Sequence, residues 1–138
     1  MSTAAINLKK VTKLYRGGRG IVDVSLEVNS GEIYGFLGPN GAGKTTTIRC
    51  MMDFIHPQSG HIKILGNDTR KNSTEARKDI GFLASDAQLY PHWTGDAYLK
   101  YLKSLRGPAD MSDIINRLGL DTSIQFRHLS TGNKQKLA

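Results

Sequence analysis

The sequence predicts an α/β fold, and three observations along the chain support this. The first third contains short apolar runs separated by glycine-rich turns, which is typical of strands. An apolar run, a glycine-rich loop and a helical pattern follow one another in the middle of the chain. The last third has helical periodicity throughout. Strands first and helices last, with a strand–loop–helix unit between them, favour an α/β layout over a helix bundle or a β-sandwich.

The first third is expected to form strands joined by turns. Residues 6–11 alternate between polar and apolar and predict one strand. Residues 16–20, with three glycines, predict a turn or a flexible loop before a second strand at 21–28. Residues 33–37 form a short apolar run of the kind found in buried strands. We therefore expect three strands before residue 38.

The middle of the chain predicts a helix flanked by further strands. The helix begins at about Lys44, places apolar side chains on one face and ends at residues 56–60. A short strand at 61–65, with its turn at 66–68, and another at 80–84 are expected to follow.

Three helices are expected in the last third. Thr94 is a suitable N-cap for the first helix, which stops at Gly107. A helix of two turns precedes Gly119, and another begins at Ser130.

Composition limits the classes of protein that the sequence fits. The chain has 138 residues, of which 38% are hydrophobic and 22% charged, so it has the size of one domain and enough apolar residues for a core. Its net charge of +7 favours an anionic partner: nucleotide phosphate, nucleic acid or a membrane surface. No apolar run approaches the ~20 residues of a membrane span. The single cysteine, Cys50, excludes an internal disulfide.

The strongest motif is a phosphate-binding loop. Residues 38–45 match GxxxxGK[ST] between a predicted strand and a predicted helix. Glycines let successive N–H groups point at one centre, and the start of the helix also favours negative charge. Lys44 adds a positive charge for the β- and γ-phosphates, Thr45 a hydroxyl for Mg²⁺, and Thr46 one for the α-phosphate. The alternative is a glycine-rich turn with an exposed lysine. The predicted binding residues are Gly38, Asn40, Gly41, Ala42, Gly43, Lys44, Thr45 and Thr46.

A second anion site is predicted at residues 129–133. Ser130 precedes a glycine-containing turn at the start of a helix. The segment from Phe126 onwards has no acidic residue. By itself this pattern fits a capped basic surface helix better than an anion site.

Together these segments resemble the ATP-binding cassette (ABC) transporter ATPases over essentially the whole chain. The family's LSGGQ-like signature has its counterpart in Leu129-Ser130-Thr131-Gly132-Asn133, and residues 80–83 and 89–95 resemble the multidrug and antibiotic exporter branch. The resemblance implies a P-loop NTPase core with an N-terminal antiparallel β part and a helical subdomain. Residues 1–90 would form the core and residues 91–138 the helical subdomain. It also implies that the chain stops before the family's Walker B strand, as an N-terminal piece of a longer ATPase.

The resemblance also implies roles for individual residues. Tyr15 would stack on adenine, although a lone tyrosine near a strand end also fits simple packing. Lys44, Ser130 and Gly132 would act on the γ-phosphate, the last two in a partner subunit. The family's Mg²⁺-contacting glutamine falls at Ser85, so Asp86 is a candidate metal ligand beside Thr45, with an ordinary polar loop as the alternative.

The function implied is that of a cytoplasmic subunit, peripheral to the membrane, which couples the hydrolysis of Mg²⁺-bound ATP to export. Its partners would be ATP or ADP, membrane-spanning subunits and a second copy arranged head to tail, with no nucleic acid. The base for the attacking water is missing, so this chain is expected to bind nucleotide at most. The rivals are a soluble ATPase of the same family acting on nucleic acid or ribosomes, and a non-catalytic nucleotide-binding module. An unpaired strand at 33–37 would promote self-association.

Overall fold

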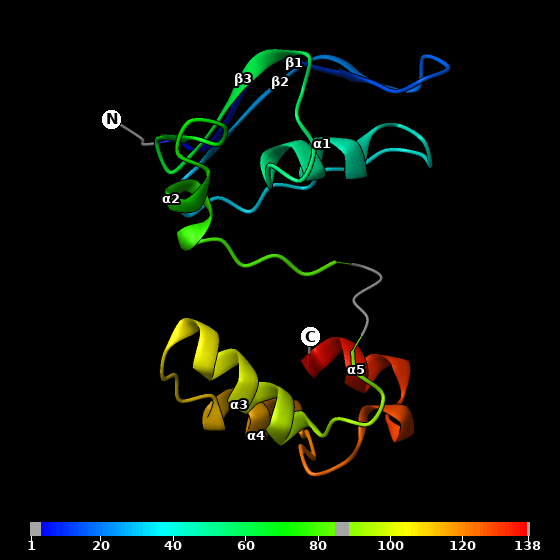
Figure 1. Ribbon diagram of the computed structural model, residues 1–138, viewed down its shortest axis with the longest axis vertical. Coiled ribbons are helices and arrows are strands. Elements are labelled where there is room, and N and C mark those ends of the chain that lie inside the picture. The colour runs from blue at the N-terminus through cyan, green and yellow to red at the C-terminus, as the bar shows by residue number, and fades with distance from the viewer. Residues whose placement is uncertain (1–3, 85–88, 138) are drawn as a thin grey trace. The chain divides into compact units, whose positions relative to one another are not determined.

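The computed structural model describes residues 4–84 and 89–137 (Figure 1). The chain forms two compact units, Met1–Gly81 and Phe82–Ala138. The sequence analysis places the boundary between the nucleotide-binding core and the helical subdomain after residue 90. That functional boundary remains a prediction.

The first unit is built on a four-stranded sheet. Its strands are β1 (Ala4–Leu14), β2 (Gly20–Asn29), β3 (Ser59–Ile64) and β4 (Asn67–Asp68), in the order β2-β1-β3-β4. Every neighbouring pair is antiparallel, and the register aligns Leu8 of β1 with Leu26 of β2 on one side and Ile62 of β3 on the other. The predicted antiparallel β part is therefore confirmed.

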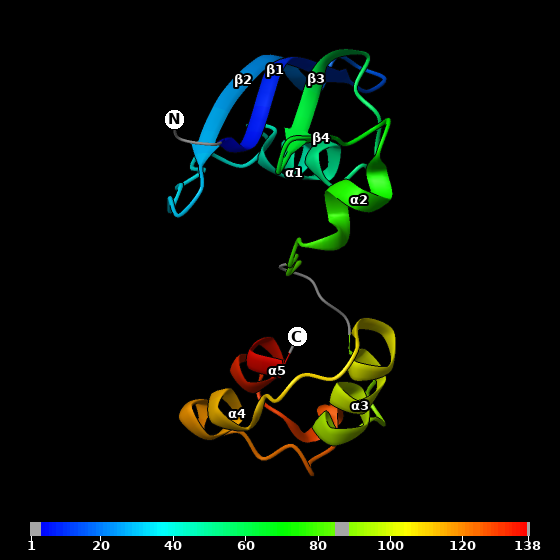
Figure 2. The ribbon, with the colours of Figure 1, turned by 90° about the vertical axis from the view of Figure 1, so that its left-hand side faces the viewer.

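Helix α1 (Lys44–Met51) packs against one face of this sheet, as both views show (Figures 1 and 2). The core lies between them because apolar side chains of β1, β2 and β3 meet the side of α1 that carries Cys50. Cys50 is 1% exposed, and burial raises the pKa of its thiol, so it packs as a small apolar group. The buried core residues are Leu8, Val11, Ile21, Cys50, Ile62 and Ile64. A short helix that the sequence analysis missed, α2 (Ser73–Lys78), follows β4 and buries Ala76.

The second unit is helical, as predicted. It contains α3 (Gly95–Arg106), α4 (Ser112–Leu118), a 3₁₀ turn at Phe126–His128 and α5 (Thr131–Leu137). The Thr94 hydroxyl accepts a hydrogen bond of 3.2 Å from the Ala97 amide, which confirms its predicted capping role. Gly119 ends α4 in the left-handed conformation, with φ of 60°. Phe126 is 1% exposed, and its ring meets that of Tyr98 edge to face at 5.6 Å.

Two predicted strands are wrong. Residues 33–37 and 80–84 have irregular backbone in this structure. Ile33 is fully exposed and Leu37 is 91% exposed, so the first run is not buried either. A strand exists only through hydrogen bonds to a neighbour, and none of the described strands pairs with these segments. Every helix within the described residues is also too short or too polar to cross a membrane.

Gly60 is expected to be essential for the β1–β3 pairing. Its φ is +90°, and a Cβ there would lie 2.4 Å from the Lys10 carbonyl oxygen. Gly66 has a φ of +81°, but a Cβ there would meet nothing within 4 Å. We expect Gly66→Ala to lower the free energy of unfolding by about 1–2 kcal/mol through strain alone. Gly60→Ala should cost at least about 2 kcal/mol more, because the steric clash adds to the strain. Urea unfolding followed by circular dichroism measures both, and equal losses would contradict the assigned contact.

The exposed run at residues 33–37 is expected to make the 138-residue chain self-associate at high concentration. Ile33→Lys should weaken this association about tenfold or more, because it removes an exposed apolar side chain from the contact. Val22→Lys is a matched control on edge strand β2, where Val22 is 64% exposed. Light scattering over a concentration series measures the effect. A monomer at every concentration, or an equal loss in both variants, would refute a contact through residues 33–37.

Candidate functional site

The loop that leads into α1 is shaped by two glycines with positive φ. Gly41 has a φ of 87° and Gly43 a φ of 90°. A Cβ on Gly43 would lie 2.3 Å from Cγ2 of Ile21, so the loop backbone packs directly on β2. A turn in which the Ala42 amide donates to the Pro39 carbonyl at 3.2 Å closes the loop. The strain and the close approach explain why the motif requires glycine at position 43.

The N–H groups at the start of α1 are available to an anion. The first helical hydrogen bonds run from Thr47, whose amide and hydroxyl donate to the Gly43 carbonyl at 2.8 and 3.0 Å. The amides of Lys44, Thr45 and Thr46 precede this position and have no acceptor within the helix. Thr47 is 0% exposed, which fixes the start of the helix against the sheet. The helix dipole adds a partial positive charge at the same place.

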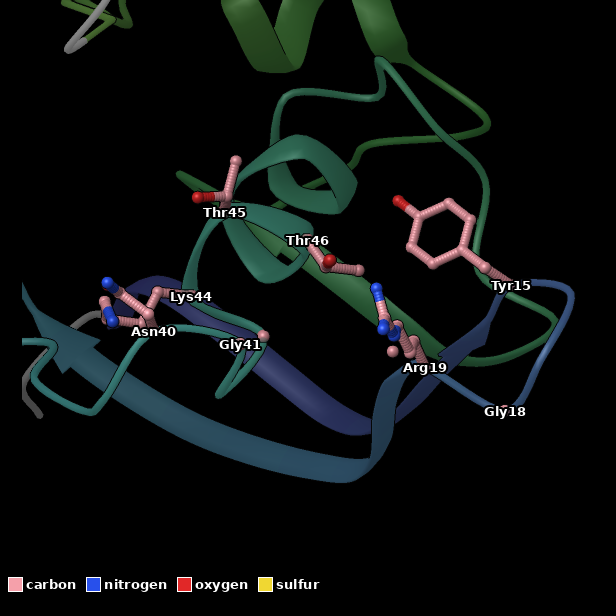
Figure 3. Close-up of a pocket in the computed structure, with 10 residues that line it drawn as sticks. Tyr15, Gly18, Arg19, Asn40, Gly41, Lys44, Thr45 and Thr46 are labelled. Carbon is pink, nitrogen blue, oxygen red and sulfur yellow. The ribbon is translucent and has the colours of Figure 1, made fainter.

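The ammonium group of Lys44 is held over the loop. Its Nζ donates to the carbonyl of Gly38 and, at 2.9 Å, to that of Pro39. An ammonium has three donors, so one remains for a ligand in the cavity. Figure 3 shows Lys44 beside Asn40, at the end of the cavity away from Tyr15.

Tyr15 is positioned by the end of β1. The side-chain amide of Gln58 donates to the Leu14 carbonyl at 2.8 Å, and its oxygen accepts from the Leu14 amide at 2.9 Å. This pairing holds the residue before Tyr15 as a neighbouring strand would. The Lys13 ammonium lies 5.8 Å from the centre of the Tyr15 ring. Tyr15 remains 42% exposed, which leaves ring surface for a ligand.

The glycine-rich loop, the start of α1 and the hairpin between β1 and β2 border an open cavity in the first unit (Figure 3). Its volume of about 680 Å³ is within the range of small-molecule sites. Seven predicted binding residues line it together, whereas Gly38 and Ala42 are not in its wall. The sequence analysis missed the hairpin residues Gly18, Arg19 and Gly20, which it treated only as a turn. Their place within five residues of Tyr15 was the available signal. No aspartate or glutamate is among the lining residues, so the wall is cationic. The lining residues are Tyr15, Gly18, Arg19, Gly20, Asn40, Gly41, Gly43, Lys44, Thr45 and Thr46.

The predicted second anion site lies in the other unit. Ser130 directly precedes α5, and its hydroxyl oxygen accepts from the Asn133 amide at 3.2 Å. This is the predicted cap, and it leaves the O–H of Ser130 as a donor. Gly132 is exposed, and a Cβ there would meet nothing within 4 Å. Both residues are thus accessible, and their role remains a prediction.

Of the two predicted Mg²⁺ ligands, Thr45 and Asp86, only Thr45 is among the described residues. Asp86, the other candidate, lies outside them. The Thr45 side chain is exposed in the first turn of α1 and lines the cavity. Residues 4–84 and 89–137 contain no cluster of three or more His, Cys, Asp or Glu side chains that could hold a metal ion.

Sequence comparisons place the chain among known proteins. The sequence profile of a family described as ABC transporter matches residues 21–138. The chain is 36% identical to the probable multidrug ABC transporter ATP-binding protein YbhF of Escherichia coli over 96% of its own length and 24% of that protein. It is 33% identical to the spermidine/putrescine import ATP-binding protein PotA of Thermobifida fusca, over 97% of the chain and 38% of that protein. The chain spans less than half the length of these curated relatives.

Comparison with solved structures gives the same fold. An ATP-binding subunit of an ABC transporter superposes on this structure with a TM-score of 0.84 at 26% identity. The match covers 96% of this chain and 59% of that one. The predicted fold class is therefore confirmed.

Proposed function

This chain belongs to the ABC transporter family, and we propose that it is the nucleotide-binding part of a transporter ATPase. The ligand proposed for the cavity of the first unit is ATP or ADP. The observation that carries the proposal is the arrangement of the two ends of that cavity. The amides of residues 44–46 and the Lys44 ammonium lie at one end, and an exposed aromatic ring, Tyr15, lies at the other.

Each end of the cavity fits one part of a nucleotide. The phosphates accept hydrogen bonds from the loop amides and from Lys44, which recognise negative charge without a particular base. The adenine ring stacks on Tyr15, whose position is set by Gln58. The exposed fraction of Tyr15 and the wall without carboxylates support this orientation.

The Thr45 hydroxyl is the proposed protein ligand of Mg²⁺, with the nucleotide's own phosphate oxygens and water completing the shell. The ion supplies charge neutralisation on the phosphates when it is bound. Lys44 adds to this neutralisation, and the loop amides orient the terminal phosphate. Because no carboxylate lines the cavity, the residues described here offer no base for the attacking water, and we expect turnover close to background.

We further propose that two copies act together, head to tail. Ser130 and Gly132 of one copy would face the γ-phosphate held by the other. The free O–H of Ser130 and the open space around Gly132 support this role. As in ABC transporters generally, membrane-spanning subunits would be the partners of the intact protein, and the cytoplasmic face of the membrane its location.

The direction of transport that we propose is export. It rests on the resemblance of residues 80–83 and 89–95 to the exporter branch and on similarity to a relative named as a multidrug transporter. A relative named as an importer is almost equally similar. Neither the +7 charge nor the cavity gives a specific argument for nucleic acid as the substrate.

Lys44→Ala is expected to weaken ATP binding by about a hundredfold or more, because it removes a charged donor from the phosphate end. Lys9→Ala removes the same charge from an exposed position outside the cavity and should change the affinity by less than about twofold. Titration calorimetry of both variants measures the difference. If both variants lost ATP affinity to a similar extent, the change in net charge alone would explain the loss. That result would refute the assigned phosphate site.

Tyr15→Ala is expected to weaken ATP binding about tenfold or more, since stacking on an aromatic ring is lost. Tyr15→Phe keeps the ring and should bind ATP within about threefold of the wild type. Inorganic triphosphate has no base, so both variants should bind it as the wild type does. The same loss of ATP and triphosphate affinity in Tyr15→Ala would remove Tyr15 from the base site.

A further inference from the structure

We propose that Arg19 binds the α-phosphate of the nucleotide and thereby sets the spacing between the base and the terminal phosphates. This inference rests on the proposed function and assigns to that site a residue that the phosphate-loop motif does not contain.

The hairpin between β1 and β2 holds the backbone of Arg19 in place. The Tyr15 amide donates to the Arg19 carbonyl at 2.8 Å, and the Gly18 amide donates to the Tyr15 carbonyl at 3.1 Å. These bonds tie Arg19 to the residue proposed to hold the base. Gly20 follows with a φ of +148°, and a Cβ there would lie 1.9 Å from the Lys13 carbonyl oxygen. The backbone therefore runs against β1 directly after Arg19, so the backbone of Arg19 is held on both sides.

The side chain of Arg19 enters the cavity between its two ends. Arg19 lines the same cavity as Tyr15 and Thr46. In Figure 3 the Arg19 guanidinium points toward Thr46 in the first turn of α1. The Tyr15 ring lies close to it on one side, and Lys44 lies farther away on the other. A nucleotide with its base on Tyr15 and its β- and γ-phosphates at Lys44 would bring its α-phosphate to this middle position.

The chemistry of the guanidinium fits this place. Arg19 makes no side-chain hydrogen bond and no ion pair with any of the residues that the structure describes. Its five N–H donors remain available, and they match the geometry of phosphate oxygens better than an ammonium does. No carboxylate lines the cavity to compete for it. The guanidinium and Lys44 are the two cationic side chains in the wall, so each neutralises a different part of the phosphate chain.

Arg19→Gln tests the inference, with Arg16→Gln as the matched control. Arg16 lies in the same hairpin, is exposed and does not line the cavity, and its replacement causes the same change in net charge. Calorimetry with ADP should show an affinity about tenfold lower for Arg19→Gln and within about twofold of the wild type for Arg16→Gln. Circular dichroism should be unchanged in both variants, because both side chains are on the surface.

The ³¹P spectrum of bound ADP locates the contact. At saturation, Arg19→Gln should move the α-phosphorus resonance and leave the β-phosphorus resonance in place, whereas Lys44→Arg should move the β resonance. Equal affinities of Arg19→Gln and Arg16→Gln, or a change confined to the β resonance, would overturn the role of Arg19. In that case the proposed nucleotide site stands, because wild-type protein still binds ADP and Lys44→Ala still loses it. A wild-type chain that binds no ADP would overturn both.

Discussion

The close contact between Gly43 and Ile21 is the constraint on which the candidate site depends. There is no space for a side chain at position 43, where a Cβ would lie 2.3 Å from Ile21, and the φ of 90° favours glycine as well. The contact attaches the loop to β2, and the burial of Thr47 and Cys50 attaches the helix to the sheet. The amides at the start of α1 are thus held by the hydrophobic core, so a ligand does not need to order them.

The same core also sets the distance between the two ends of the cavity. Tyr15 directly follows β1, Arg19 directly precedes β2, and α1 begins at Lys44. All three elements share the core around Leu8 and Ile21. The side-chain amide of Gln58 also bonds the N–H and the C=O of Leu14, as the backbone of a neighbouring strand would do. A flexible ligand such as a nucleotide therefore meets fixed groups for its base and for its phosphates, which limits the entropy lost on binding.

Local signals predicted the parts of the fold that depend on nearby residues. The cap at Thr94, the end of a short helix before Gly119 and the start of α1 each follow from a few adjacent residues, and the structure contains all three. The apolar run at 33–37 has the composition of a strand, but strand formation depends on a distant partner that periodicity does not reveal. Arg19 is close to Tyr15 in the sequence, but it was missed because hairpin geometry, which the glycine-rich turn does not specify, brings it to the cavity. The proposed phosphate loop could be singled out because the motif itself specifies a backbone conformation, and five of its predicted residues besides Thr46 line the cavity.

The central claim is that the amides of the loop and of the first turn of α1 converge on a phosphate. Amide ¹⁵N–¹H chemical shifts during a titration with pyrophosphate test it most directly, since each amide reports its own hydrogen bond. The account predicts saturable shifts at Gly41, Gly43, Lys44, Thr45 and Thr46, much larger than those elsewhere. Unchanged shifts at these positions, with weak changes spread over the exposed basic residues, would contradict it.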